Sequence, residues 1–440
     1  MKWLVVLALV VAVPAAADPI DKLFPYLDAK TPGAVVVLVN HGKVIARRAY
    51  GAADVELGVK MSAEQRFRIA SISKQLTAVA ILQLVDAGKL ALDQPIHSYL
   101  PDAPAAWAPV TLAALLSHTS GLPSFVDAKD VADAANGAQT YGELRALLDK
   151  KPLHTRPGTE HAYNNWGYAV LAQVLERATG QPYCAYVTLH LLAPLNMIHT
   201  VCATGGAVVA GLVNGYDRAY GREWIRPRGV AFEAALVSAG GWVSTVDDLA
   251  AWTTALTSGK LLKPETFAKL YVATSVAQGT VPYSFGTRLR TEDGHALLLA
   301  NGDLPGFHSE IAYDKDCDCA AISLFNWNAP YPFLTRRLLA IARGAPIHDP
   351  APVKVSEAEL AKLVGTYRAG DHQPQRELVL DHGRLYCHDD GDPGRDALVP
   401  LGNNVFRYTI DDGNRLTVSG ETLTFGDDEQ VWHAAQQRVR

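Results

Sequence analysis

Ser71 and Lys74 are the residues of this chain whose types and spacing best suit covalent chemistry. They belong to the segment FRIASISKQLTAVAILQLVDAGKL, where a serine opens a predicted helix and a lysine follows three residues later. In a helix, this spacing places both side chains on one face, one turn apart. A desolvated amine can take the proton of a serine hydroxyl, and the helix N-terminus adds free N–H groups and partial positive charge. The turn therefore predicts a serine nucleophile with half of an oxyanion hole. The alternative is a helix cap followed by a solvated lysine, which Ser-x-x-Lys forms by chance in many chains.

A second group with chemical potential is Tyr163-Asn164-Asn165, in PGTEHAYNNWGYAVLAQVLERATG. A tyrosine hydroxyl can act as a general base where nearby cations lower its pKa, and Lys74 is a candidate for that cation. Asn165 is predicted to hold the lysine and to hydrogen-bond a substrate amide. The alternative is an aromatic loop that enters a helix beginning near Trp166.

The elements that must position these residues form an α+β pattern. Two strands are predicted in residues 34–50 around a turn at His41 and Gly42, and further strands in 295–302, 309–314 and 319–327. Strands at both ends of the segment with helices between them predict an antiparallel sheet flanked by helices, in a domain that closes near residue 344.

Helix boundaries follow from capping residues and glycines. The Ser71 helix is predicted to end at Gly88, and residues 241–256 are predicted to contain a helix capped by Ser244 or Thr245. A further helix is predicted at residues 334–343.

The C-terminal part of the chain has a different composition. Residues 345–358 are rich in proline and lack strong periodicity, which indicates a linker. Residues 359–440 contain short alternating strands separated by turns, which predict a small antiparallel β-barrel or sandwich.

Composition bounds the class of protein. The chain has 440 residues, of which 49% are hydrophobic and 19% charged, with a net charge of -5. This is an ordinary globular composition, long enough for two or three domains. The sequence shows no basic stripe of the kind that nucleic-acid binding needs, so no nucleic-acid partner is predicted.

The N-terminus resembles an export signal. An apolar run from Trp3 to Val13 follows Lys2, and Ala15–Ala17 fits a cleavage site before Asp18. We therefore predict that residues 1–17 are a signal peptide and that the mature protein is periplasmic or secreted, with no stable membrane span. The alternative is an uncleaved membrane anchor.

Five cysteines raise the question of disulfides, which an oxidising compartment permits. Cys184 and Cys202 are the pair to test first, whereas Cys317 and Cys319 are expected to lie too close together to bridge easily. No cysteine and histidine cluster has zinc spacing, so no metal and no cofactor are predicted.

Taken together, these blocks resemble the serine β-lactamase and penicillin-binding-protein superfamily, on the side of class C β-lactamases and related esterases and D-peptidases. The superfamily carries Ser-x-x-Lys with a Ser-Asp-Asn second motif, and the Tyr-x-Asn variant here resembles the class C branch. LLSHTSGLP and SAGGWVSTVDDLAAW also resemble sequence blocks that are usual in that family. The likeness covers roughly residues 20 to 343, within an expected hydrolase domain of 18–344. The C-terminal region resembles, more weakly, the lipocalin-like barrel that follows such domains in some of these hydrolases.

The resemblance implies a role for each matched residue. Ser71 is the acylated nucleophile, and its backbone N–H is one oxyanion donor. Lys74 and Tyr163 share proton transfer, while Asn165 helps to place the substrate and the lysine. His118, in SHTSG, invites a catalytic interpretation, but the matching block of the family is structural.

The third motif departs from the family pattern, which has a lysine or histidine, any residue, then glycine. Anchored on the Leu-Pro-Gly-Phe that ends at Phe307, Ala300 stands in place of the basic residue and Gly302 is retained. Asp303 falls where the second oxyanion N–H is expected. In the family the basic residue helps to hold a substrate carboxylate, so its loss should weaken recognition of β-lactams and D-Ala-D-Ala ends. An anionic Asp303 would instead favour either a substrate with a free amine or a neutral ester.

Two alternatives concern this motif and its consequences. A register slip would let His295 or His308 supply the missing base. The degraded motif also allows a binding or sensor protein that is acylated but turns over slowly.

The sequence as a whole predicts an exported serine hydrolase that forms an acyl-enzyme. Its substrate would be a small molecule or peptide with an amide or ester: a D-amino-acid peptide, including cell-wall-derived ones, a β-lactam or a small ester. The barrel is interpreted as an accessory domain, with a separate ligand-binding function as the alternative. The sequence does not predict the oligomeric state.

Overall fold

A computed structural model gives the fold of the chain. It describes residues 18–438 except for 26, 124–139, 204–206, 220–222, 228–235, 277–278, 293, 328–331, 347–351, 369–374, 390–395, 409–414 and 427–435. The predicted signal peptide, residues 1–17, lies outside the described residues. Within the described part, every helix is too short or too polar to cross a membrane.

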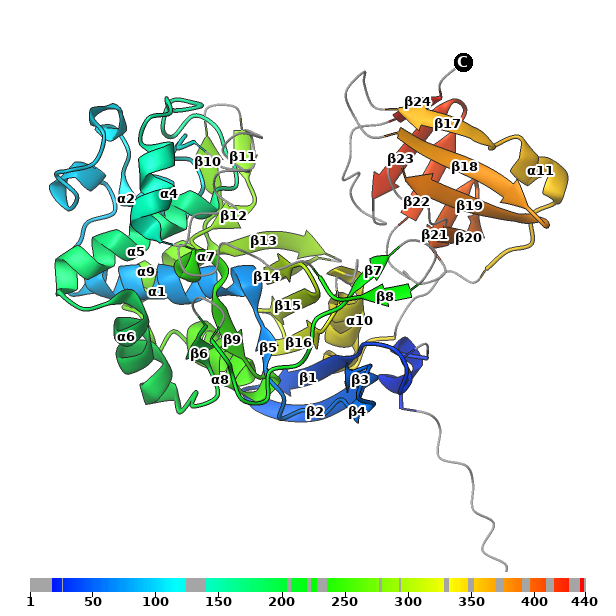
Figure 1. Ribbon diagram of the computed structural model, residues 1–440, viewed down its shortest axis with the longest axis horizontal. Helices are drawn as coiled ribbons and strands as arrows, with labels where there is room; N and C mark the ends of the chain where they lie inside the picture. Colours follow the sequence, from blue (N-terminus) through cyan, green and yellow to red (C-terminus); the bar gives the residue numbers. More distant parts are fainter. Residues whose placement is uncertain are drawn as a thin grey trace, which may run out of the picture.

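The centre of the N-terminal domain is a seven-stranded antiparallel sheet (Figure 1), with strand order β12-β13-β14-β15-β16-β1-β2. The bounds of its strands are β1 Ala34–Asn40, β2 Lys43–Tyr50, β12 Tyr283–Ser284, β13 Thr287–Glu292, β14 His295–Leu304, β15 Phe307–Asp314 and β16 Cys319–Phe325. The predicted strands are therefore confirmed. The first strand of the domain pairs with the last, because β1 and β16 run antiparallel with Val37 opposite Ile322.

The central strands are apolar on both faces because each face carries its own core. In β1, Val35 and Val37 belong to one core, whereas Val36 and Leu38 belong to the other. This alternation follows from the two-residue period of a strand. It explains why AVVVLV is a continuous apolar run in an antiparallel sheet, where one-sided burial would give alternation.

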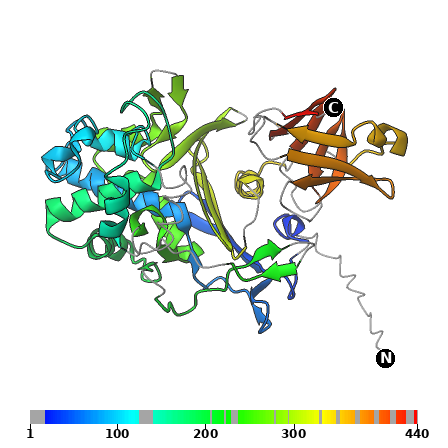
Figure 2. The ribbon, with the colours of Figure 1, turned by 45° about the horizontal axis from the view of Figure 1, so that its top comes forward.

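Helices cover both faces of the sheet (Figure 2). One face carries α1 Ser73–Asp86, α5 Asn165–Thr179 and α8 Val246–Thr257, whose apolar residues join the larger core. Of these, α8 packs directly on β1 and β16, and α5 packs on α1. The other face packs against α10 Pro332–Ala342 through residues such as Leu338. This arrangement confirms the predicted antiparallel sheet flanked by helices.

Shorter elements complete the domain. The remaining helices are α2 Leu112–Leu116, α4 Tyr141–Leu148, α6 Tyr183–Val187, α7 Val237–Gly240 and α9 Pro264–Ala268, with helical turns at η1 Asp21–Leu23, η2 Ala70–Ile72, η3 Ile96–Ser98, η4 Ala105–Trp107, η5 Thr188–Leu192, η6 Ala193–Leu195 and η8 Lys269–Tyr271. The remaining strands are β3 Ala52–Asp54, β4 Val59–Lys60, β5 Phe67–Arg68, β6 Val201–Cys202, β7 Asp217–Ala219, β8 Glu223–Ile225, β9 Trp242–Ser244, β10 Thr274–Val276 and β11 Gly279–Val281.

Capping residues set the starts of two of these helices. Thr245 caps α8, because its side chain accepts a hydrogen bond from the N–H of Asp248, which confirms one of the two predicted caps. Asn164 caps α5 in the same way through the N–H of Gly167. This cap fixes the chain immediately after Tyr163.

The C-terminal region is a closed eight-stranded antiparallel barrel (Figure 1). Its strands are β17 Gly365–Arg368, β18 Gln375–Asp381, β19 Arg384–Asp389, β20 Asp396–Gly402, β21 Val405–Tyr408, β22 Arg415–Ser419, β23 Thr422–Gly426 and β24 Gln436–Arg438. Its core contains Tyr367, Leu378, Leu398 and Phe406. A short helix, α11 Glu357–Ala361, starts inside the predicted linker and is capped by Ser356.

Two disulfides are present among the described residues. Cys184 bonds to Cys202, as predicted. Cys317 also bonds to Cys319, so the expectation that they lie too close to bridge is wrong. The turn between β15 and β16 sets their Cα atoms 5.3 Å apart, which is within the usual range for a disulfide.

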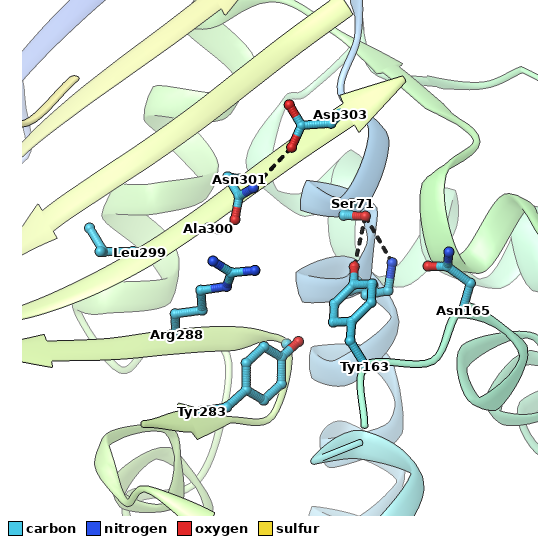
Figure 3. Close-up of a pocket in the computed structure, with 11 residues that line it drawn as sticks. Ser71, Tyr163, Asn165, Tyr283, Arg288, Leu299, Ala300, Asn301 and Asp303 are labelled. Carbon is cyan, nitrogen blue, oxygen red and sulfur yellow. Dashed lines mark hydrogen bonds between the residues drawn. The ribbon is translucent and has the colours of Figure 1, made fainter. Parts of the chain in front are cut away.

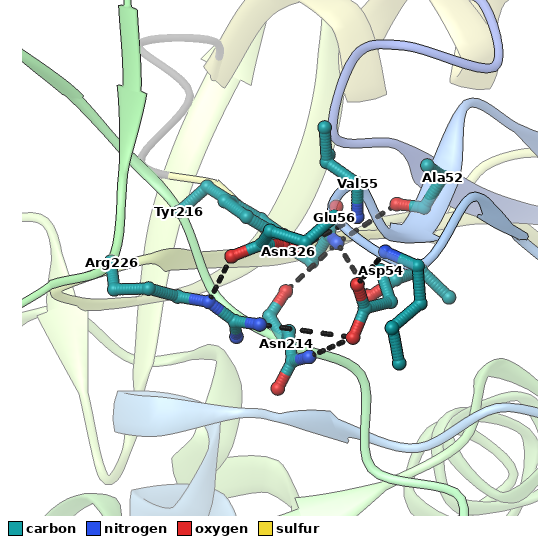
Figure 4. A network of polar contacts seen from close by, with 10 residues as sticks. Ala52, Asp54, Val55, Glu56, Asn214, Tyr216, Arg226 and Asn326 are labelled. Carbon is teal, nitrogen blue, oxygen red and sulfur yellow. Dashed lines mark hydrogen bonds and ion pairs between the residues drawn. The ribbon is translucent and has the colours of Figure 1, made fainter.

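A polar network ties three distant segments together where β1 begins and β16 ends (Figure 4). The Asn326 side chain accepts from Gly33 N at 2.6 Å and donates to the carbonyls of Ala52 and Asn214. Nearby, Tyr216 donates to Glu56, and this bond lowers the pKa of Glu56 to about 2.

The segment held by this network also holds the turn between β14 and β15. Asp217 follows Tyr216 directly, and its carboxylate accepts from the N–H of Gly306 at 2.7 Å. Gly306 lies in that turn with φ of 79°, a left-handed conformation that favours glycine. The network therefore positions the end of β14, where Asp303 lies.

Candidate active site

Ser71 lies in the helical turn η2, immediately before α1, and faces a pocket of about 220 Å³ (Figure 3). The pocket is lined by Ser71, Lys74, Tyr163, Asn165, Tyr283, Gly286, Arg288, Leu299, Ala300, Asn301 and Asp303. The residue before the serine, Ala70, has φ of 44°, which is uncommon for a residue with a side chain. Such local strain recurs at functional sites.

Two polar side chains meet at the Ser71 hydroxyl oxygen. Lys74 Nζ lies 2.9 Å from Ser71 Oγ, and the Tyr163 hydroxyl donates to the same oxygen at 2.8 Å. Figure 3 draws both contacts as dashed lines from Ser71. Lys74 belongs to α1, and Tyr163 lies in the loop before α5. The three side chains that the sequence predicted to act together are therefore in direct contact.

Burial lowers the pKa of Lys74 and so favours the neutral amine, which can act as a base. The side chain is 1% exposed, and this desolvation holds the pKa of Lys74 well below its usual value. A neutral amine keeps a lone pair, which at 2.9 Å can accept the Ser71 proton. Its own hydrogens have a partner as well, because Nζ donates to the Ala239 carbonyl at 2.7 Å.

The pKa of Tyr163 is raised, so the expectation that nearby cations lower it is wrong. The surrounding protein desolvates the hydroxyl and raises the pKa of Tyr163 to about 12, while the Ser71 hydrogen bond and the charge of Arg288 only partly oppose this. At neutral pH the hydroxyl keeps its proton. It can therefore act as a proton donor to groups at Ser71 Oγ.

Asn165 is the first residue of α5 and lines the pocket, as expected of a substrate-binding residue. The expected contact with Lys74 is not seen. Within the described residues, the hydrogen bonds of Lys74 go to Ser71 and to the carbonyl of Ala239 in α7. The lysine is thus held by a backbone carbonyl on α7.

Gly302 is where β14 approaches the nucleophile most closely. A Cβ atom at this position would lie 2.7 Å from Ser71 N and 2.3 Å from the Ile69 carbonyl oxygen. Ser309, on β15, braces the contact by donating to the same Ile69 carbonyl at 2.9 Å. The predicted close backbone approach is confirmed, and no larger side chain fits without moving one of the two segments.

Gly302→Ala is therefore expected to push β14 away from the Ser71 turn. Losing one oxyanion donor typically costs about a hundredfold or more in turnover, and we expect a loss of that size in hydrolysis of p-nitrophenyl acetate. Gly142→Ala, on α4 with nothing within 4 Å of the added atom, is the matched control and should leave the rate unchanged. A Gly302→Ala variant that keeps its activity within a few-fold would contradict this placement.

Asp303 lies at the edge of the pocket, and its carboxylate already has partners. It lies 2.6 Å from His308 Nδ1 and accepts from Asn301 Nδ2 at 3.0 Å. Burial works to raise the pKa of Asp303, but the hydrogen bond and charge of His308 outweigh it, so the pKa lies below its usual value. Asp303 is therefore anionic, as predicted, and faces His308. Burial works to lower the pKa of His308, but the hydrogen bond and charge of Asp303 outweigh it and raise that pKa.

Neither histidine replaces the missing basic residue. His308 is buried behind Asp303, and His295 lies at the other end of β14, 2.9 Å from Asp314. Ala300 itself is buried and lines the pocket wall. The register-slip alternative is therefore wrong.

A cation that the sequence interpretation missed enters the pocket from the neighbouring strand. Arg288 lies on β13 opposite Leu299 of β14, and Figure 3 shows its guanidinium pointing between Asn301 and Tyr283 toward the serine. Its charge lowers the pKa of both Tyr163 and Asp303 as a minor contribution. Among the described residues, the Arg288 side chain has no hydrogen-bond or ion-pair partner, although its backbone pairs with Tyr283 and Leu299 in the sheet. The pairing of β13 with β14, which sequence alone does not reveal, places the cation there.

Potential metal donors gather elsewhere, at the turn between β15 and β16. Two overlapping sets are Asp314 with Cys317 and Cys319, and His295 with Asp314 and Asp316. The two sulfurs are bonded to each other, and Asp314 accepts from Arg343 at 2.5 Å. These donors are already engaged with protein partners.

Comparisons with known proteins agree with the geometry. A family model described as Beta-lactamase matches residues 20–345. Protein flp from Staphylococcus aureus strain MW2 is 35% identical over 173 residues, which are 38% of this chain and 34% of flp. Esterase EstB from Burkholderia gladioli is 37% identical over 183 residues, which are 38% of this chain and 45% of EstB. The match thus spans less than half the length of either relative.

Among solved structures, the octameric penicillin-binding protein homologue from Pyrococcus abyssi superposes with a TM-score of 0.67. The alignment covers 95% of this chain and 97% of that one at 21% identity. At this identity, the likeness concerns the fold alone.

Proposed function

Because the chain belongs to the beta-lactamase family, we propose that it is an exported serine hydrolase that cleaves an amide or ester through an acyl-enzyme on Ser71. The observation that carries the proposal is the placement of a desolvated amine and a protonated phenol on one serine oxygen. The export part rests on the signal-like sequence of residues 1–17.

The proposed reaction begins with acylation. Lys74 Nζ takes the Ser71 proton as Oγ attacks the substrate carbonyl, and the backbone N–H groups of Ser71 and Asp303 would receive the developing oxyanion. The leaving group then takes a proton from Tyr163, which regains one from Lys74. Positioned acid and base groups of this kind typically contribute about 10² to 10⁴ in rate.

Deacylation repeats these proton transfers with water. Lys74 takes a proton, relayed through Tyr163, from a water that attacks the acyl carbon, and a proton returns to Ser71 Oγ as the ester bond breaks. Atoms balance over the cycle, because one water is consumed and each residue recovers its starting protonation state.

Arg288 bears on which substrates the site takes. It restores the positive charge that Ala300 removes from the third motif, whereas the Asp303 carboxylate is already bound by His308 and Asn301. This balance favours substrates with a carboxylate near the scissile bond, such as D-amino-acid peptides or β-lactams, over substrates selected by a free amine. Small neutral esters remain within reach of the same nucleophile.

Arg288→Gln tests this preference. A charge-assisted hydrogen bond is worth about 1.5–3 kcal/mol, so we expect KM for a carboxylate-bearing chromogenic cephalosporin to rise by about 10- to 100-fold. Hydrolysis of neutral p-nitrophenyl acetate should change little. Asp303→Asn is the companion variant. If Asp303→Asn, and not Arg288→Gln, altered the ratio of the hydrolysis rates of amine-bearing and neutral substrates, the site would select substrates by a free amine and not by a carboxylate.

The function as a whole is tested by a small substrate panel. Mature protein is incubated with a chromogenic cephalosporin, p-nitrophenyl acetate and D-alanine p-nitroanilide, and both turnover and intact mass are followed. Steady turnover of at least one compound that Ser71→Ala lacks would support the hydrolase.

The panel also separates the second candidate, a slow-turnover binding or sensor protein. This alternative is motivated by Ala300 in the third motif. It predicts a stable adduct on Ser71 with release too slow for turnover. The hydrolase is favoured by the intact Ser71, Lys74 and Tyr163 and by the Arg288 guanidinium in the pocket.

A further inference from the structure

His118 lies directly behind the tyrosine loop and holds the chain on both sides of Tyr163. Its backbone carbonyl accepts from the N–H of Ala162 at 2.8 Å. Its ring nitrogen Nδ1 accepts from the N–H of Asn164 at 3.1 Å. One residue thus binds both chain neighbours of the phenol that contacts Ser71.

The ring of His118 also packs against the aromatic side chains of the pocket. Its centroid lies 4.3 Å from the Tyr163 ring and 4.8 Å from the Tyr283 ring. The residue is 1% exposed and has φ of 58°, a conformation in which histidine and asparagine are enriched. The backbone carbonyl, the ring and one ring nitrogen of His118 therefore all contact the Tyr163 loop.

The second ring nitrogen reaches Tyr283. His118 Nε2 lies 3.1 Å from the Tyr283 hydroxyl, and Tyr283 lines the pocket. Because Nδ1 accepts a backbone N–H, a neutral ring must carry its proton on Nε2 and donate it to Tyr283. Burial, with the charge of Lys74, holds the pKa of His118 well below its usual value, which agrees with a neutral ring. The Tyr283 hydroxyl, having accepted one hydrogen bond, has its own proton for a second partner. That partner is either a substrate in the pocket or the neighbouring Tyr168 hydroxyl, which donates its own proton to the Leu116 carbonyl.

We infer that His118 is a positioning residue that fixes Tyr163 at the nucleophile and orients the Tyr283 hydroxyl as a donor into the pocket, toward the substrate. The inference rests on the proposed function and extends it, since it assigns a substrate contact to Tyr283. It replaces a purely structural role for SHTSG with a role in proton transfer and substrate binding.

Two substitutions at His118 separate the two bonds. His118→Asn tolerates the positive φ and offers an Oδ1 that can accept from Asn164 N, but it is too short to reach Tyr283. His118→Phe keeps a ring in the aromatic cluster but offers neither bond. Tyr283→Phe removes the hydroxyl alone. All variants are compared by their rate of labelling with a fluorophosphonate and by kcat and KM for p-nitrophenyl acetate, with thermal unfolding as the check on folding.

We expect His118→Phe to slow fluorophosphonate labelling by about 10- to 100-fold, within the range of a displaced acid or base group. His118→Asn should recover most of that rate, because the Asn164 bond is restored. Tyr283→Phe should raise KM several-fold in the wild type and have no further effect in His118→Asn, where its bond to residue 118 is already lost.

The outcomes distinguish this inference from the proposed function. If wild-type protein is not labelled at all, the hydrolase proposal fails. If wild type is labelled but folded His118→Asn is as slow as His118→Phe, the link through Asn164 is wrong. If Tyr283→Phe has the same effect on KM in both backgrounds, the orientation of Tyr283 by His118 is wrong. A His118→Phe variant too unstable to measure leaves the other two variants to decide.

Discussion

Ser71→Ala is expected to lower the turnover of every ester or amide substrate by about 10³-fold or more, the scale seen when a nucleophile is removed from a unit that works together. Lys74 and Tyr163 would remain in place but would have no oxygen between them to activate. Any residual rate would come from the oxyanion donors and from binding alone. The measurement is hydrolysis of p-nitrophenyl acetate and the cephalosporin at saturating concentrations.

Ser73→Ala is the matched control for this substitution. Ser73 lies two residues away and is fully buried, where its hydroxyl accepts from Trp242 N at 3.3 Å, outside the pocket lining. We expect its removal to affect stability modestly and turnover little. Equal rates for Ser71→Ala and wild type would mean that another residue carries out the reaction.

Lys74→Met is expected to have a comparable effect on catalysis, because it replaces the amine with an uncharged side chain of similar length. Acylation in the wild type should rise with pH as the amine loses its proton. Burial lowers the pKa of Lys74, so this rise should lie below the range of ordinary lysines, and it should disappear in Lys74→Met. The measurement is the pH dependence of fluorophosphonate labelling.

The same substitution gives a second, independent prediction about stability. Between the folded pKa of Lys74 and about 10.4, the value for a free lysine, the unfolded chain binds one more proton than the folded one. The free energy of unfolding should therefore rise with pH across that window and be flatter in Lys74→Met. Since folding must deprotonate and bury an amine that is charged in the unfolded chain at neutral pH, Lys74→Met should also be the more stable protein there, a common trade between activity and stability.

Lys89→Met is the control for both measurements, since this lysine is exposed just beyond the end of α1. It should alter neither the pH profile nor the stability slope. If Lys74→Met acylated at the wild-type rate across the pH range, the amine would not be the base.

Much of the fold followed from local patterns in the sequence. The apolar run of β1, the turn at His41 and Gly42 and the cap at Thr245 are each set by a few neighbouring residues. The three-residue spacing of Ser71 and Lys74 likewise predicts that their side chains are neighbours, and the two are in direct contact.

Features that depend on long-range packing were missed or misjudged. The pKa of Tyr163 is set by how much protein surrounds its hydroxyl, which adjacent residues do not reveal. Arg288 enters the pocket because β13 pairs with β14, and the Ala239 carbonyl takes the contact with Lys74 expected of Asn165 because α7 packs on α1. The α7–α1 contact joins segments far apart in the chain, whereas β13 and β14 are consecutive strands whose register brings Arg288 into the pocket.

The most direct test of the central claim is the intact mass of the protein after reaction with a fluorophosphonate, followed by peptide mapping. We expect one adduct per chain, located on Ser71, formed by the wild type and by Ser73→Ala but not by Ser71→Ala. An unlabelled wild-type protein, or an adduct on any other residue, would contradict the assignment of Ser71 as the nucleophile.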